Sequence, residues 1–101
     1  MSKKYEGIFI IKELENEKKV DEIIQKINKS ILSEKAELTK KEKLGLRKLA
    51  YRIKDQEKGY YYVVNYKVLD DDNKTKGKIE IKINTIEEVI KYMIILTNNE
   101  E

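Results

Sequence analysis

The chain has 101 residues, which is enough for one compact domain and too few for two. It contains no cysteine and no histidine, so thiol nucleophiles, imidazole bases and the usual ligands of zinc and iron–sulfur centres are excluded. Its 22 basic and 19 acidic residues leave a net charge of +3, a surplus that permits nucleic-acid binding without requiring it. Only two of the basic residues are arginines, Arg47 and Arg52, and they lie close together.

The apolar runs of the chain are short. The run near the N-terminus, 8–11, and the longest C-terminal run, 92–96, are far below the roughly 20 residues that a membrane helix needs. The absence of cysteine fits a reducing compartment. We therefore expect a soluble, unexported protein of the cytoplasm.

The first third of the sequence predicts a strand followed by a helix. Residues 5–12, YEGIFIIK, are β-branched or aromatic with apolar side chains in both phases, as in a central strand. Asn16 can cap a helix over about 17–34. On one face of this helix apolar residues recur at spacings of three and four, and the opposite face is polar. These apolar residues are Val20, Ile23, Ile24, Ile27 and Ile31.

The middle third predicts a hairpin. Apolar residues between positions 36 and 53 change phase near Gly45, which indicates a long, irregular strand with a bulge. The polar segment 54–59, KDQEKG, is typical of a turn, and 60–69, YYYVVNYKVL, is a strong strand signal.

The last third allows two orders of elements. Ile79, Ile81 and Ile83 alternate as in a strand, and residues 86–94 have helical spacing, so the pattern alone favours strand then helix. In the opposite order, residues 70–73 cap a helix that starts near residue 72, and 89–96 form an interior strand. In both orders the segment 97–101, TNNEE, is expected to be a frayed tail.

The second order gives a single domain of the α+β class, the ferredoxin-like βαββαβ fold, with two helices on one face of a four-stranded antiparallel sheet. Metal carriers of this fold need a cysteine pair, and its small hydrolases need a phosphate-cradling glycine loop near the first strand, but neither is present. Glu87 and Glu88 are an unsuitable acid–base pair because neighbours on a strand point to opposite faces. RNA binding is the remaining use of the fold, although a fold alone does not choose a function.

A tyrosine-rich segment supports one version of RNA binding. Residues 58–63, KGYYYV, partly match the RNA-recognition signature K/R-G-F/Y-G/A-F-V, with Tyr61 and, two positions beyond the match, Asn65 as departures. This gives an alternative function, an independent single-strand RNA-recognition module that stacks bases on Phe9, Tyr60 and Tyr62. The other interpretation is that these rings only fill a sheet face and its core contact.

One ordered set of motifs carries a family resemblance. LGLRKLAYRI at 44–53 is followed six residues later by GYY at 59–61, with YE at 5–6 and VIKYM at 89–93 in the expected places. The set resembles the bacterial ribosomal protein S-six family over about residues 4–96. The resemblance implies the ferredoxin-like order of elements and so overrides the pattern reading of residues 72–96.

The resemblance also implies a function. A member of this family is expected to be a non-enzymatic constituent of the small ribosomal subunit that binds the central domain of small-subunit ribosomal RNA jointly with ribosomal protein S-eighteen. No cofactor, metal, membrane or small-molecule substrate is implied. The expected RNA contacts are Lys3, Lys4, Tyr5, Lys54 and Lys91. The expected protein-partner contacts are Leu46, Arg47, Lys48, Leu49 and Arg52.

These partner contacts lie on the strand expected over 36–53, which is an edge strand in this topology. Its unpaired backbone groups, together with Leu46 and Leu49, can be covered by another chain. The alternative is that Leu44, Leu46, Leu49 and Ile53 belong to the ordinary core.

Overall fold

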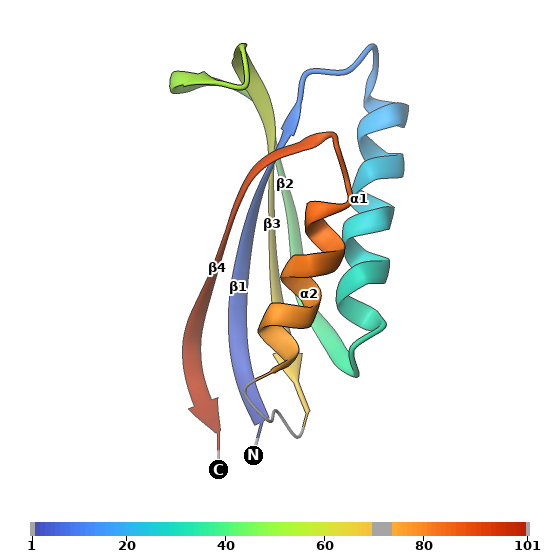
Figure 1. Cartoon of the computed structure of the whole chain (residues 1–101), viewed down its shortest axis with the longest axis vertical. Helices are drawn as coiled ribbons and strands as arrows, with labels where there is room; N and C mark the ends of the chain where they lie inside the picture. Colours follow the sequence, from blue (N-terminus) through green and yellow to red (C-terminus); the bar gives the residue numbers. More distant parts are fainter. Residues whose placement is uncertain (1, 70–73, 101) are drawn as a thin grey trace.

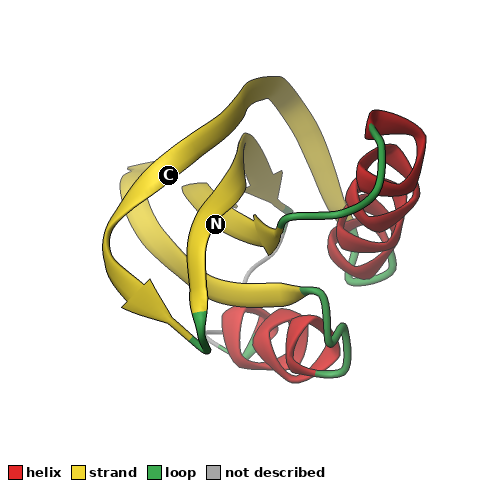
Figure 2. Cartoon of the chain, turned by 90° about the horizontal axis from the view of Figure 1, so that it is seen from above, coloured by secondary structure: helices red, strands yellow, loops and turns green. Residues whose placement is uncertain are grey.

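The computed structural model describes residues 2–69 and 74–100. The elements follow in the order β1 (Ser2–Lys12), α1 (Glu17–Leu32), β2 (Ala36–Ile53), β3 (Gln56–Val68), α2 (Thr75–Asn84) and β4 (Val89–Glu100). All strand pairs are antiparallel, in the sheet order β2-β3-β1-β4. Both helices cover the same side of the twisted sheet (Figures 1 and 2). The predicted ferredoxin-like fold is confirmed.

The two faces of the sheet have different roles. Its helix face carries one phase of each central strand, for example Phe9 of β1 beside Tyr62 of β3, and both side chains are buried. The main core lies between this face and the helices. The opposite side, which we call the open face, carries Ile8, Ile10 and Tyr61. The faces follow from the period of two along a strand.

Helix α1 begins where the sequence predicts. The Oδ1 atom of Asn16 accepts a hydrogen bond from the backbone N–H of Lys19 at 3.0 Å, as an N-cap side chain does. The helix ends at Leu32, two residues before the predicted end. One polar residue, Asn28, lies on its buried face, where its Oδ1 accepts a 2.6 Å hydrogen bond from the hydroxyl of Tyr62.

Helix α2 shows that the family order is right and the local pattern is misleading. Ile79 and Ile83 are one helical turn apart and buried, whereas Ile81 between them is 68% exposed. The alternation of isoleucines at 79, 81 and 83 therefore combines two buried residues of one helix face with one exposed isoleucine on another face. The helix begins at Thr75 instead of near residue 72, and the predicted cap at 70–73 lies outside the described residues.

Strand β4 differs from two predictions. It lies at an edge of the sheet and not in the interior, because β1 has β3 on one side and β4 on the other. It also continues to Glu100, pairing with the start of β1, so residues 97–100 are in a strand instead of a frayed tail. The predicted edge position of β2 is confirmed.

The hairpin between β2 and β3 is longer than predicted. The turn consists of Lys54 and Asp55, with φ angles of 48° and 66°, and β3 already begins at Gln56. Gly45 has a φ of 87° at a shift in register after Lys43, which confirms the bulge predicted there. The end of the hairpin bends away from the helices (Figure 1).

Candidate nucleic-acid and partner interface

The end of the β2–β3 hairpin, residues 47–58, packs on the open face of the sheet. We call it the hairpin end. The pairing of β2 with β3 shifts between Lys48 and Ile53, so this part of β2 leaves the plane of the sheet. Leu49, only 6% exposed, forms a second small cluster with Ile10 and Ile90. This cluster fixes the hairpin end to β1 and β4.

An apolar slot of about 270 Å³ lies beside this cluster, between the hairpin end and β4. Ile8 and Ile10 form its floor, Leu49 and Ile53 line it from the hairpin, and Met93 borders it from β4. The side chain of Met93 is half exposed.

Lys91 and Tyr51 meet at the slot although they are 40 residues apart. The Nζ of Lys91 donates a 2.6 Å hydrogen bond to the Tyr51 hydroxyl and lies 5.2 Å from the centre of its ring. Together the two distances place the ammonium at the hydroxyl end of the ring, so the contact is a charge-assisted hydrogen bond to the phenol oxygen. Tyr51 is 62% exposed, so the contact lies at the surface of the protein.

The hairpin end also carries most of the predicted basic contacts. Arg47, Lys48, Arg52 and Lys54 are all exposed. The Nε of Arg47 donates a hydrogen bond to the carbonyl of residue 44 at 3.4 Å. Lys54 and Lys91 line one further hollow, near the start of β4. The fold therefore gathers basic groups that the sequence separates.

Lys3 and Lys4 lie at the other end of the molecule, where both termini are found (Figure 1). Lys4 pairs with Lys67 and Asn98, while Lys91 pairs with Ile10, six positions further along β1. At about 3.3 Å per residue, the two basic groups are roughly 20 Å apart. The predicted RNA contacts thus form two groups instead of one site.

Two predicted contacts belong to the core. Tyr5 is 5% exposed and stacks on Tyr66 with ring centres 5.4 Å apart, because its phase of β1 faces the helices. Leu49 is buried in the second cluster because the hairpin end packs on the open face of the sheet. A direct contact of either side chain with RNA or a partner does not fit these positions. Leu46, by contrast, is 40% exposed on β2.

The structure also buries the aromatic rings on which the alternative function, an independent RNA-recognition module, depends. Phe9 and Tyr62 are 0% and 1% exposed, and Tyr60 packs against the same core from the helix face. An RNA-recognition module needs such rings on a surface that bases can reach. None of these three rings lies on the open face, so the predicted stacking site is wrong.

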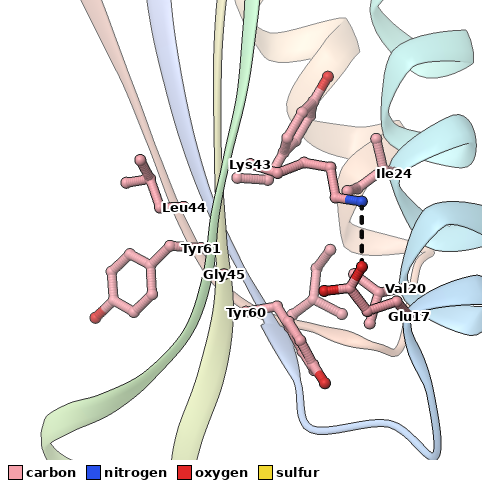
Figure 3. A pocket seen from close by; sticks show the side chains of 10 residues that line it. Glu17, Val20, Ile24, Lys43, Leu44, Gly45, Tyr60 and Tyr61 are labelled. Atoms are coloured by element: carbon pink, nitrogen blue, oxygen red, sulfur yellow. Dashed lines mark ion pairs between the residues drawn. The ribbon is translucent and has the colours of Figure 1, made fainter.

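A second pocket, of about 210 Å³, lies between α1 and the bulge of β2 (Figure 3). Its one ammonium, Lys43, is 2.6 Å from a carboxylate oxygen of Asp21 and 3.9 Å from one of Glu17. The hydrogen bond to Asp21 raises the pKa of Lys43 and outweighs the opposing effect of burial. Because two carboxylates already neutralise this lysine, the pocket is a poor site for an anion.

Neither described helix has the length and apolar character of a membrane-crossing segment. Nor does the described part of the chain place three or more aspartate or glutamate side chains where they could hold a metal ion. No local pattern predicts the Tyr51–Lys91 contact or the packing of Leu49 on Ile90, since both depend on the bend of the hairpin end.

Together, the fold and its surface define a small ferredoxin-like binding domain, with a basic hairpin end and a buried aromatic core. The model of the family described as "Ribosomal protein S6" matches residues 4–96. The chain belongs to the ribosomal protein S6 family.

Individual relatives agree with this assignment. "Small ribosomal subunit protein bS6" of Fusobacterium nucleatum is 31% identical over 93 residues, which cover 92% of this chain and 96% of the relative. The protein of the same name from Rickettsia prowazekii is 33% identical over 91 residues, covering 90% and 73%. The crystal structure of 30S ribosomal protein S6 from Thermotoga maritima superposes with a TM-score of 0.85 at 26% identity, covering 96% of this chain and 89% of that one.

Proposed function

We propose that the protein is a structural, non-catalytic constituent of the small ribosomal subunit, located in the ribosome of the cytoplasm. We also propose that it binds the central domain of small-subunit ribosomal RNA jointly with ribosomal protein S-eighteen. The observation that carries the proposal is the family match over residues 4–96, with relatives named small ribosomal subunit proteins at 31% and 33% identity.

The distribution of charge supports RNA binding by two separate groups of lysines. Lys3 and Lys4 form the group at the terminal end, and Lys54 and Lys91 form the group at the hairpin end. Lysines neutralise phosphates as point charges and give salt-dependent affinity. With a net charge of only +3, neither group is expected to give tight, selective binding alone.

The edge strand β2 supports a place for the protein partner. Leu46 is 40% exposed there, and Arg47, Lys48 and Arg52 are exposed beside it. The three register shifts in the β2–β3 pairing interrupt the regular ladder that an added strand would need. We therefore propose that the partner is held through these side chains more than through backbone pairing.

Assembly of small subunits tests this proposal. Cells that carry a tagged copy of the chain should show it in the small-subunit fraction of a sucrose gradient, and chemical footprinting should show protection in the central domain. The footprint should weaken when ribosomal protein S-eighteen is depleted. As a control for loss of an unrelated surface lysine, alanine at Lys18, an exposed residue of α1, should leave the footprint intact. A chain that stays at the top of the gradient, or a footprint in another RNA domain, would contradict the proposal.

A further inference from the structure

The contact between Lys91 and Tyr51 joins the two surfaces that the proposed function keeps separate. Lys91 lies on edge strand β4 among the proposed RNA contacts, whereas Tyr51 lies on the hairpin end among the proposed partner contacts. The 2.6 Å hydrogen bond holds one group against the other.

The position of Tyr51 depends on the packing of the hairpin end. Leu49, two residues before it, is buried against Ile10 and Ile90, so the backbone of this segment is fixed relative to β1 and β4. Ile90 is also the residue next to Lys91. One small cluster therefore sets the relative position of the tyrosine and the lysine.

We infer that Tyr51 is a positioning residue for Lys91, and that this pair couples the partner-binding edge of β2 to an RNA-phosphate site at the start of β4. The inference rests on the proposed function and deepens it. It names the part of the chain through which binding of the protein partner strengthens binding of RNA.

Tyr51 can favour phosphate binding by Lys91 because a lysine side chain is flexible. A free lysine side chain has many rotamers, and contact with a phosphate restricts them. Tyr51 has already restricted Lys91 in the free chain. An ammonium has three N–H donors, so the bond to Tyr51 leaves two for the oxygens of a phosphate.

The coupling follows from the location of Tyr51 on the hairpin. A partner that covers Leu46 and the neighbouring basic residues of β2 adds to the packing of Leu49 and further stabilises the hairpin end, and with it the contact between Tyr51 and Lys91. Lys91 then meets the phosphate with less loss of freedom, which is positive cooperativity through order instead of through a new contact. Lys54 and Glu87 line the same hollow as Lys91, so two ammonium groups outweigh one carboxylate near that phosphate.

The test is a double-mutant cycle on the affinity of the protein for central-domain RNA, measured with and without ribosomal protein S-eighteen. The variants are Tyr51→Phe, which keeps the ring and removes the hydroxyl, Tyr51→Leu, which removes both, and Lys91→Ala, alone and combined with each. Tyr60→Phe is the matched control because it removes a tyrosine hydroxyl from the helix face. Tyr51 is 62% exposed, so folding of its variants is expected and is checked by circular dichroism.

With the partner present, Tyr51→Phe and Tyr51→Leu should each weaken RNA binding by about threefold, because both remove the hydroxyl that holds the ammonium. Neither should have an effect in the Lys91→Ala background, and Tyr60→Phe should have none in either background. Equal losses with and without Lys91 would mean that Tyr51 has only a structural role, and unchanged binding would mean that it has none; either result overturns the inference. If the unaltered pair does not bind central-domain RNA, the proposed function itself fails, which is a separate outcome.

Discussion

Leu46 and Leu49 lie three residues apart in the family-specific segment, yet the structure gives them opposite roles. Leu49 is 6% exposed and packs on Ile10 and Ile90, whereas Leu46 is 40% exposed on the edge of the sheet. We predict that Leu49→Ala lowers the free energy of unfolding and that Leu46→Ala instead weakens association with the protein partner.

The size of the Leu49 effect follows from its surroundings. Leucine-to-alanine changes in closed cores cost about 2–5 kcal/mol, depending on how well the site can collapse. The second cluster is small and borders an open slot of about 270 Å³, so its neighbours can relax and water can enter. We expect a loss of about 2–3 kcal/mol, which lowers the melting temperature by roughly 8–24 °C. For Leu46→Ala we expect less than about 0.5 kcal/mol.

Urea unfolding followed by circular dichroism measures both values, and titration with ribosomal protein S-eighteen measures partner affinity. Hydrogen exchange of the hairpin-end amides adds a local readout, because Leu49→Ala should speed exchange there before it affects α1. The reasoning is refuted if Leu49→Ala costs less than about 0.5 kcal/mol while it weakens partner binding as much as Leu46→Ala.

Three further predictions concern the core and the edge strand. Tyr62→Phe leaves the buried Oδ1 of Asn28 without its donor and should cost about 1–3 kcal/mol in urea unfolding, with part recovered when Asn28→Leu is added. Burial raises the pKa of Tyr62 above its usual value near 10. The unfolded chain therefore ionises first as pH rises, and stability that is complete below about pH 10 should fall above it, less steeply in Tyr62→Phe than in the unaltered protein. Joint replacement of Arg47 and Lys48 by alanine should weaken partner association while the free energy of unfolding changes by under about 0.5 kcal/mol; unfolding of that variant would show a structural role instead.

Local signals in the sequence were sufficient for the elements that depend on near neighbours. The cap at Asn16, the spacing of the apolar residues after it and the bulge at Gly45 are all properties of short segments, and the structure has them where they were predicted. The turn was placed correctly at Lys54 but made too long, since positive φ angles at two non-glycine residues have little signal in the sequence.

The remaining features depend on tertiary contacts. The alternation of Ile79, Ile81 and Ile83 fits a strand as well as a helix with one exposed residue, and only the family resemblance chose correctly. The burial of individual candidate contact residues also depends on tertiary packing. Pattern alone did not show that Tyr5 and Leu49 are buried. The packing of the whole sheet decides that Tyr5 faces the helices, and the bend of the hairpin end buries Leu49 on the open face.

Joint binding can be tested directly by the salt dependence of RNA affinity. Labelled central-domain RNA is titrated at several salt concentrations with the chain alone and with its pair with ribosomal protein S-eighteen. Each neutralised phosphate contributes about −0.9 to the logarithmic slope on duplex RNA and less on single strands. We predict weak binding with a shallow slope for the chain alone, tight binding with a steep slope for the pair, and a reduction of about one unit for alanine at Lys4 or Lys91. Tight, site-selective binding by the chain alone that the partner leaves unchanged would contradict joint binding.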